Sequence, residues 1–389
     1  MSRFMRVSLL LLLAGCASRP QAARPELRGV WVATMDNIDW PSRRDLTTEQ
    51  QKAELVAIFD RAASLGLNAV FLQVRPMADA IYPAPGSPWS EYLTGAMGRP
   101  PEPVWDPLAF AIAEAHARGL ELHAWFNPFR ARHPASTSPL AAPHLAVRRP
   151  ELVRTYGRHL WLDPGDAEAR AEVLAAVLDV VRRYDVDGVH MDDYFYPYPE
   201  DDQPFPDDAT WQRYRGRLSR NDWRRKNIDD FVRTLYTSVK AIRPGVQVGI
   251  SPFGIWRPGH PSQIRGFDAY AKLYADARLW LRRGWLDYLA PQLYWPIDRR
   301  EQSFPVLLRW WLSQNRRGRG VVAGLSVSRV TRTFTADEIA RQIELTRRSR
   351  ANGFILFSAR ALMEDRGGVN AAITRALGTA DDLKPASRH

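Results

Sequence analysis

Two adjacent aspartates, Asp192 and Asp193, follow an apolar run of the sequence that ends at Met191. Side chains alternate along a β-strand, so His190 and Asp192 are expected on one face and Met191 and Asp193 on the other. Met191 is apolar and is expected to face the packed helices. Its neighbour Asp192 then points to the opposite face of the strand, toward the inside of the sheet. A carboxylate there loses hydration, and carboxylates held at that cost are common in catalytic sites. We therefore predict Asp192 and Asp193 as catalytic residues, with Asp193 in reach only if the strand ends before it.

A pair of carboxyl groups is the usual machinery for breaking a glycosidic bond. One carboxyl donates a proton, and the other acts as the nucleophile or stabilises the oxocarbenium ion. Asp192 is the candidate for the second role. The proton donor stays open, because Asp193 competes with Asp39, Glu200 and Asp298 from predicted loops. A substrate with N-acetyl groups can also supply its own nucleophile, so retention, inversion and substrate assistance all stay open.

Aromatic, amide and charged side chains follow the other apolar runs of the chain. A saccharide site needs flat aromatic faces for the apolar sides of pyranose rings, and polar groups for the hydroxyls. We predict as substrate-binding residues His190, Tyr194, Tyr196, Asp39, Trp40, Gln73, Arg75, Asn127, Trp256, Gln292, Tyr294 and Trp295. The same strand ends also carry Asp36, Asn37, Trp125, Arg130, Ser251 and Phe253. These residue types together predict a groove that binds carbohydrate.

The sequence predicts neither a metal nor a cofactor. Its eight histidines are scattered, and His190 with Asp192 makes at most two ligands, fewer than a catalytic zinc site has. It has no G-x-S-x-G motif of the kind that presents a nucleophilic serine. His123 lies within an apolar run, which is typical of a hydrogen-bonded core residue.

Eight apolar runs can form the strands that position these residues. They are Arg28–Thr34, Asn68–Arg75, Leu120–Arg130, Val186–Asp193, Val246–Gly254, Leu286–Trp295, Gly320–Val330 and Gly353–Arg360. Between them lie segments with apolar residues at i, i+3 and i+4 spacing, which predict helices. One helix is expected to start near Thr47 or Thr48 and to stop at Gly66. Another has Asp106 as its cap and Pro107 at its first position.

The alternation of strands and helices predicts an α/β fold, a single (β/α)8 TIM-type barrel over residues 26–378. An open, doubly wound sheet is the alternative, which the lack of a Gly-rich loop after the first strand disfavours. Long loops follow strands two, three and four. In a barrel these loops rise over the carboxyl ends of the strands, where barrel enzymes place their sites.

The N-terminus resembles a bacterial lipoprotein signal over residues 1–15. Two arginines precede the apolar run Val7–Ala14, which is too short to span a bilayer. The sequence LAGC that follows resembles a lipobox and contains the only cysteine, Cys16. We predict that Cys16 carries acyl chains that anchor the protein to a membrane. A plain signal peptide with an incidental cysteine is the alternative.

The segments that flank the barrel give further expectations. Residues 16–25 are predicted to form the lipidated cysteine and a tether, and residues 379–389 a disordered tail. Ala17, which stands where an aspartate would retain a lipoprotein in the inner membrane, resembles the pattern sorted to the outer membrane. We expect the protein in the cell envelope, anchored to the periplasmic face of the outer membrane.

The formal net charge of +11 comes almost entirely from arginine. The arginines are spread along predicted helices, often in pairs, as solvated helix faces are. Nucleic-acid binding needs clustered positive charge and conflicts with an exported chain, so we predict no nucleic-acid partner.

Several long motifs resemble the glycosyl-hydrolase-like ten family, a bacterial group of exported barrel proteins. They are ELRGVWVATMDNIDWPS (26–42), AVFLQVRP (69–76), HAWFNPFR (123–130), DGVHMDDYFYPYP (187–199), GISPFGIWR (249–257), YADARLWLRRGWLDYLAPQLYW (274–295) and GFILFSA (353–359). The resemblance implies a (β/α)8 barrel that hydrolyses cell-wall glycan. A member of the family is an outer-membrane lipoprotein of the division site that cleaves peptidoglycan strands stripped of their stem peptides. The resemblance therefore implies two kinds of partner, which are peptidoglycan strands and cell-division proteins.

DGVHMDDY also looks like the DGxDxDxE strand of chitinase-type barrels, with Asp192 at its last aspartate and Tyr194 where the acid glutamate stands. It looks equally like the strand-four R-x-D of the amylase group, with Asp192 at the nucleophile. Because neither alignment supplies a proton donor, a non-catalytic glycan-binding lipoprotein on a degenerate barrel is the alternative function.

Overall fold

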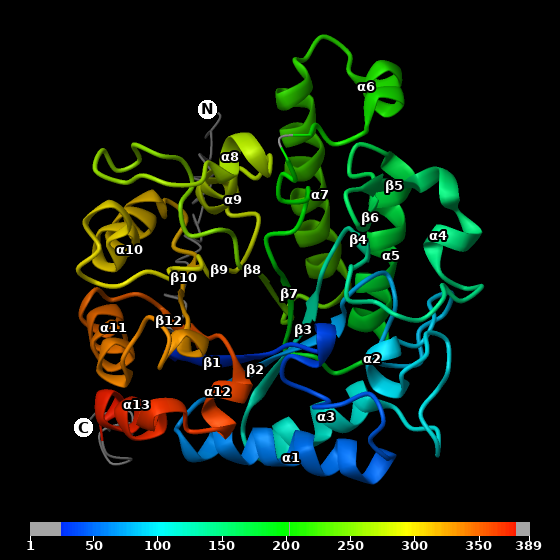
Figure 1. Ribbon diagram of the computed structural model, residues 1–389. Coiled ribbons are helices and arrows are strands. Elements are labelled where there is room, and N and C mark those ends of the chain that lie inside the picture. Colours follow the sequence, from blue (N-terminus) through cyan, green and yellow to red (C-terminus); the bar gives the residue numbers. More distant parts are fainter. Residues whose placement is uncertain (1–24, 202, 379–389) are drawn as a thin grey trace, which may run out of the picture.

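The computed structural model describes residues 25–201 and 203–378 of the chain. The expected signal peptide, the lipidated Cys16, most of the tether and the tail at 379–389 lie outside the described residues. Parallel strands stand at the centre of the molecule with helices around them (Figure 1).

Nine parallel strands form the central sheet, in the order β10-β9-β8-β7-β3-β2-β1-β12-β11. Their bounds are β1 (Leu27–Val32), β2 (Ala69–Arg75), β3 (Glu121–Phe126), β7 (Gly188–Met191), β8 (Gln247–Ile250), β9 (Tyr288–Leu289), β10 (Gly320–Val321), β11 (Ala323–Leu325) and β12 (Gly353–Leu356). Only Val322 separates β10 from β11. Because β10 pairs with β9 and β11 pairs with β12, the two pieces serve as one strand that closes the sheet. All eight predicted strands are present, and the predicted (β/α)8 barrel is confirmed.

Each barrel strand is followed by a helix. The main helices are α1 (Thr48–Ser64), α3 (Pro107–Ala117), α5 (Ala167–Arg183), α7 (Arg220–Ile242), α9 (Ala277–Arg283), α10 (Phe304–Gln314), α11 (Ala336–Arg348) and α13 (Val369–Leu377). Shorter helices are α2 (Glu91–Thr94), α4 (Leu145–Arg148), α6 (Asp208–Tyr214), α8 (Ala269–Lys272) and α12 (Ala359–Met363).

The predicted helix starts agree with the structure. Thr47 caps α1 in a capping box with Gln50, so each residue satisfies a backbone N–H of the other. Asp106 caps α3 through the N–H groups of Leu108 and Ala109, and Pro107 occupies the first position, where no N–H is needed. Local side-chain chemistry therefore sets where these two helices begin.

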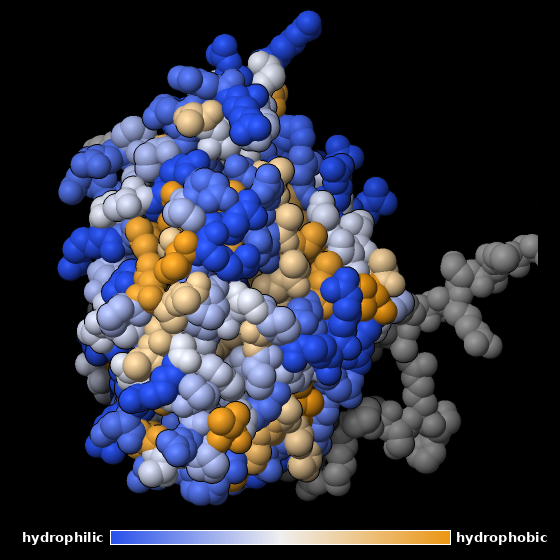
Figure 2. Space-filling model, turned by 90° about the vertical axis from the view of Figure 1, so that its right-hand side faces the viewer, coloured by the Kyte–Doolittle hydropathy of each residue, from blue (hydrophilic) through white to orange (hydrophobic). Residues whose placement is uncertain are grey.

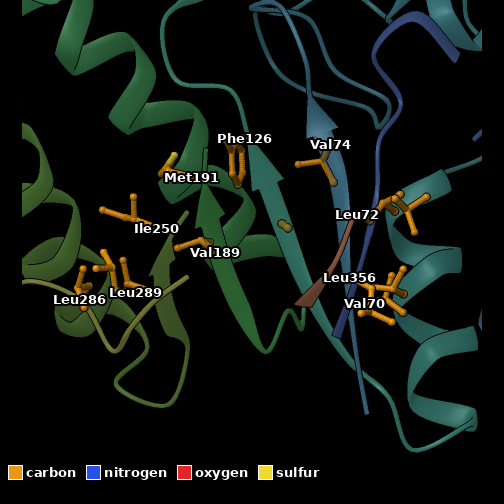
Figure 3. Packing of buried hydrophobic residues seen from close by; sticks show 14 of the residues in the cluster. Val70, Leu72, Val74, Phe126, Val189, Met191, Ile250, Leu286, Leu289 and Leu356 are labelled. Atoms are coloured by element: carbon orange, nitrogen blue, oxygen red, sulfur yellow. The ribbon is translucent and has the colours of Figure 1, made fainter. Parts of the chain in front are cut away.

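Two buried layers hold the barrel together. Outward-facing residues of the strands pack against the helices, as Val70 and Leu72 of β2 and Val189 and Met191 of β7 do (Figure 3). Inward-facing residues fill the barrel, mainly with the aromatic rings of Trp31, Phe71, Trp125 and Tyr288, and the aliphatic Ile355 packs among them. The alternation of strand residues thus separates a helix-facing layer from a ring-filled interior.

The long loop after β3 forms a second, antiparallel sheet that the sequence did not predict. Its order is β4 (Arg130–Arg132), β6 (His159–Leu162) and β5 (Val153–Tyr156). On the side of the molecule seen in Figure 2, hydrophobic residues lie in small separate groups within a largely hydrophilic surface. Among the residues described, no helix combines the length and the apolar composition that crossing a bilayer requires.

Candidate active site

A pocket of about 310 Å³ opens at the carboxyl ends of the barrel strands. It is lined by Trp31, Ala33, Met35, Asp36, Ile38, Gln73, Trp125, Arg130, His133, Asp192, Asp193, Tyr194, Ser251, Gln292, Tyr294 and Phe357. Asp192 and Asp193 therefore face the same space. They are the only carboxyl groups on its wall, among the residues described, apart from the rim residue Asp36.

Asp193 reaches the pocket because the strand ends early. β7 stops at Met191, and the backbone N–H of Phe195 donates to the carbonyl of Asp193 at 3.0 Å, which turns the chain. In a longer strand the side chains would keep alternating and Asp193 would face the helices. The strand ends at Met191, so this alternation does not reach Asp193. Asp193 was expected to point away only if the strand stayed regular, and because the strand ends before it, the condition set for its participation is met.

Asp192 is a buried carboxyl held by three N–H donors. Trp125 Nε1 and Asn127 Nδ2 approach its Oδ2 at 3.2 Å and 3.0 Å, and the backbone N–H of Tyr194 approaches Oδ1 at 3.3 Å. Burial nevertheless raises the pKa of Asp192 from 3.8 to about 7, since desolvation outweighs the attraction of Arg130 and the N–H donors. The negative charge of Asp193 adds to this rise. Oδ1, with its single long hydrogen bond, is the oxygen best placed to carry a proton.

Asp193 is buried in a different environment. Its carboxylate accepts hydrogen bonds from the hydroxyl of Tyr198 and from the side chain of Gln292. Burial raises the pKa of Asp193 as well, while these two donors oppose the rise by stabilising the charged form. Two buried carboxyls on one pocket wall resist double ionisation, so the pair tends to hold one proton.

A column of hydrogen bonds fills the barrel beneath the pocket. Trp31 Nε1 donates to His190 Nε2 at 3.2 Å, and because an indole nitrogen only donates, His190 must accept there and carry its proton on Nδ1. That proton is donated to the Tyr288 hydroxyl at 3.0 Å, and Tyr288 in turn donates to His123 Nδ1 at 3.0 Å. His123 Nε2 then donates to Glu121 at 3.1 Å. Trp31 thereby fixes the tautomer of both buried histidines, and desolvation keeps the pKa of His190 well below its usual value.

Several predicted binding residues lie in the pocket or touch its carboxyls. Tyr194, Gln73, Gln292 and Tyr294 line the wall, and Asn127 bonds to Asp192. Gln73 uses its carbonyl oxygen to accept the N–H groups of Thr34 and Met35, so it also fixes the loop after β1. His190 is fully buried and supports the floor through Ser251, 3.0 Å away.

Other predicted binding residues lie elsewhere, in the core beneath or beside the loops. They are Asp39, Trp40, Arg75, Tyr196, Trp256 and Trp295, none of which lines the pocket. Trp40 donates to the carbonyl of Gln51, and Arg75 donates to Ser87 and to the carbonyl of Asp79. Each of these side chains is used for loop packing.

Tyr196 and the two tryptophans are held by aromatic neighbours. Tyr196 packs edge-on against Phe205 and Tyr274. Trp256 stacks on Trp310 at 5.8 Å, and Trp295 packs against Phe253. Aromatic residues that follow a strand therefore serve two purposes here, and the residue type alone did not distinguish them.

The three alternative proton donors also lie away from the pocket wall. Asp39 accepts the N–H groups of Ala33 and Arg360 and the hydroxyl of Ser358, and burial raises its pKa to about 6. Glu200 is bonded to a histidine of β6, and the side chain of Asp298 is 82% exposed. None of the three shares the space that Asp192 and Asp193 face.

Some pocket residues were not predicted as binding residues. They are Trp31, Ala33, Met35, Asp36, Ile38, Trp125, Arg130, His133, Ser251 and Phe357. Arg130 is buried, and its guanidinium lies 5.0 Å from the ring centre of Tyr194. Desolvation and the nearby charge of Arg130 lower the pKa of His133 to about 4, so this imidazole is neutral near pH 7. The position of Trp125 and Arg130 at a strand end was a usable signal, whereas His133 and Phe357 carried none.

Within residues 25–201 and 203–378, no group of three or more histidine, cysteine, aspartate or glutamate side chains is arranged to hold a metal ion.

Buried paired carboxyls and aromatic rings at the mouth of a (β/α)8 barrel are typical of the glycoside-hydrolase class of proteins. Comparison with known proteins agrees with this class. The model of the family described as "Glycosyl hydrolase-like 10" matches residues 26–339, and the chain belongs to this family.

Two curated relatives show the same relationship. The chain is 40% identical over 375 residues to "Glycosyl hydrolase YngK" of Bacillus subtilis (strain 168), an alignment that covers 92% of this chain and 73% of the relative. It is 37% identical over 344 residues to "Glycosyl hydrolase DigH" of Escherichia coli (strain K12), which covers 78% of this chain and 77% of the relative.

Solved structures share the fold at low sequence identity. The glycoside hydrolase domain of PgaB (BpsB) from Bordetella bronchiseptica superposes with a TM-score of 0.59 at 16% identity, over 90% of this chain and 98% of that one. Alpha-L-fucosidase isoenzyme 2 from Paenibacillus thiaminolyticus has a TM-score of 0.55 at 13% identity, over 90% of this chain and 48% of that one. These likenesses support the barrel alone.

Proposed function

We propose that this protein is a glycosidase that hydrolyses the glycan strands of bacterial peptidoglycan. The observation that carries the proposal is the pair Asp192 and Asp193, two buried carboxyls on the wall of one pocket at the catalytic end of a barrel. Membership of a glycosyl-hydrolase-like family supports the same reaction class.

The two carboxyls take different roles in this proposal. Asp192, with a pKa of about 7, protonates the glycosidic oxygen as the bond to the anomeric carbon breaks. Asp193, whose charged form is stabilised by Tyr198 and Gln292, faces the positive charge that develops on the sugar ring. Asp192 then accepts a proton from the attacking water. These roles reverse the assignment expected from strand alternation, because burial favours the protonated form of Asp192.

The pocket suits amino sugars that carry a carboxylate. Trp125, Tyr194 and Tyr294 offer aromatic faces for sugar rings, and Arg130 contributes a buried cation to the same wall. Removal of the stem peptide from peptidoglycan leaves a free carboxylate on each lactyl ether, and an arginine is the side chain that recognises carboxylates best. Strands stripped of their peptides are therefore the proposed substrate.

The cellular setting is part of the proposal. A lipid anchor at Cys16 would place the barrel at the periplasmic face of the outer membrane, beside the cell wall. Cell-division proteins are candidate partners for a hydrolase at that location. Globomycin treatment, which blocks lipoprotein processing, tests the anchor by the accumulation of an unprocessed form that Cys16→Ser also produces.

The reaction is tested with purified protein and peptide-free glycan strands, by the release of reducing ends. Asp192→Asn and Asp193→Asn should each lose at least about a hundredfold in activity. Glu200→Gln and Asp298→Asn serve as matched controls and should keep it. Strands that bind to the wild-type protein without any new reducing ends would establish a glycan-binding protein instead.

The role of Arg130 is tested by comparing two substrates, one with and one without the lactyl carboxylate. Arg130→Met should raise KM for peptide-free strands about ten- to a hundredfold, since it removes a buried partner of a carboxylate. Oligomers of N-acetylglucosamine, which lack the lactyl carboxylate, should show little change. Equal losses on both substrates would contradict a carboxylate contact.

A further inference from the structure

An unusual group of arginines gathers at the end of the barrel opposite to the pocket. We call it the arginine cluster, and it consists of Arg278, Arg282 and Arg283 of α9 with Arg316 and Arg317 of the loop between α10 and β10. These five residues, with Asp276 and Leu279, line a surface pocket of about 480 Å³. The cluster thus surrounds a space open to an external ligand.

The five arginines of the cluster surround one pocket without a carboxylate partner. Many other arginines of the protein are ion-paired, as Arg243 is with Asp185 and Arg375 is with Asp337. Among the residues described, no member of the cluster lies within 4.0 Å of a carboxylate oxygen of an aspartate or glutamate. Arg278 donates to the amide oxygen of Gln314 at 2.8 Å, and its guanidinium lies 4.9 Å from the ring centre of Trp256. Among the residues described, Asp276 is the one carboxylate that lines the pocket with the five arginines.

The electrostatics of the cluster agree with an excess of positive charge. The pKa of Arg282 is lowered by desolvation and then by the like charges of Arg316 and Arg278, while the negative charge of Asp276 opposes this shift. Helix dipoles account for part of the arrangement, because Arg282 and Arg283 lie in the last turn of α9, where cations are favoured. They do not account for Arg316 and Arg317, which lie in a loop.

The position of the cluster relative to the chain start decides what it faces. Arg282 and Arg283 end α9, which leads into β9, and the 315–319 loop leads into β10, so these residues lie toward the amino ends of the strands, whereas Asp192 follows the carboxyl end of β7. Pro25, just before β1, lines a cavity of about 730 Å³ together with Gly318 and Arg319. The described chain therefore starts at the face that carries the cluster.

The anchor expected at Cys16 brings a membrane to this face. The nine residues 17–25 can span at most about 30 Å when fully extended, so an anchor at Cys16 keeps Pro25 within about that distance of the membrane. Electrostatic interactions are screened beyond about 8 Å at physiological salt, so the arginines respond to a surface only when the domain rests on it. A lipid surface rich in phosphate is the partner within reach.

We propose that the arginine cluster docks on anionic lipid headgroups and turns the mouth of the barrel away from the membrane, toward the cell wall. The inference rests on the lipid anchor of the proposed function, but not on the hydrolysis itself. The docked orientation presents Asp192 and Asp193 to a polymer that lies parallel to the membrane at the far side of the domain.

Vesicle binding tests the proposal with the full chain carrying Cys16→Ser, which has no acyl anchor. The quantity measured is the ratio of affinities for vesicles of phosphatidylcholine with and without about a third of phosphatidylglycerol, so that apolar insertion by residues 7–14 cancels. The triple substitution Arg282→Gln, Arg283→Gln and Arg316→Gln should lower this ratio about a hundredfold, and salt should lower it in the parent protein. The matched control, Arg213→Gln with Arg215→Gln and Arg217→Gln, removes the same charge from the α6 region and should leave the ratio unchanged.

Other outcomes overturn the proposal. An equal ratio in the parent and the cluster variant, or an equal loss in the control, excludes docking by these arginines. Full competition by millimolar inorganic phosphate would reveal a site for small anions in place of a membrane surface. Hydrolysis of glycan strands in solution is measured in parallel and should be equal in all three proteins, so a failure of the proposed reaction is seen separately from a failure of docking.

Discussion

The buried carboxyl of Asp192 should impose a basic limb on the pH dependence of kcat/KM. Its pKa is raised to about 7, so the protonated fraction falls from about nine-tenths at pH 6 to about one-tenth at pH 8. The folded pKa lies above the ordinary value of an aspartate, hence the proton is retained below pH 7 and lost as the pH rises. With Asp192 as the acid, kcat/KM on peptide-free strands should fall about tenfold for each pH unit above 7.

Substrates with different leaving groups separate an acid from a carboxylate that acts in its charged form. Asp192→Asn should lose about 10²- to 10⁴-fold on glycan strands and little on a nitrophenyl glycoside, because nitrophenolate leaves without a proton. Asp193→Asn should lose on both substrates. Release of reducing ends and of nitrophenolate are the two assays. A wild-type profile that stays flat up to about pH 9, or a nitrophenyl substrate that rescues Asp193→Asn and not Asp192→Asn, would refute the assignment.

Three further predictions concern the supports of the site. Tyr198→Phe removes a hydrogen bond to the charged form of Asp193 that is worth about 1.5–3 kcal/mol. The acidic limb of the pH profile of kcat/KM should therefore move up by about one to two pH units. A limb that does not move would show that Asp193 does not titrate there. Asp39→Ala leaves two backbone N–H groups and a hydroxyl without their acceptor and should lower the free energy of unfolding by about 2–4 kcal/mol in chemical denaturation, whereas a loss below about 1 kcal/mol would contradict the bonding described. Nitrogen-15 NMR should find His190 protonated on Nδ1, and Tyr288→Phe should perturb that signal; a proton on Nε2 would contradict the hydrogen-bond column.

The sequence predicted the barrel because its signals are local. Apolar runs and helical spacing depend on neighbours within a few residues, and the caps at Thr47 and Asp106 act on the next turn of chain. The antiparallel sheet after β3 was missed, because its strands are short and its partners are set by packing on the barrel. Local patterns therefore determine the elements, and tertiary contacts determine the insertions.

The site residues were predicted correctly where they lie just after a strand that leads into the pocket. They were predicted wrongly where long-range contacts of a loop decide their position. Asp192, Gln292 and Tyr294 follow their strands directly into the pocket. Asp39 lies in the loop after the first strand, but this loop turns inward, and Asp39 bonds to residues of the last strand's loop, more than 300 residues away in the sequence. Phe357 enters the pocket from that same remote segment. A single sequence contains no local pattern that predicts contacts between loops so far apart along the chain.

The first and last strands of the barrel are direct neighbours, and this order has a consequence for how the protein matures. β1 pairs with β12 over Leu27 to Val30, and Asp39 binds Ser358 and the N–H of Arg360 across the same junction. The closing contacts cannot form until nearly the whole chain has left the ribosome, or any channel it crosses unfolded, because contacts of such sequence separation form late. Until then both strands at the gap expose unpaired edges. Truncation near the C-terminus should therefore leave an open, aggregation-prone sheet rather than a smaller barrel.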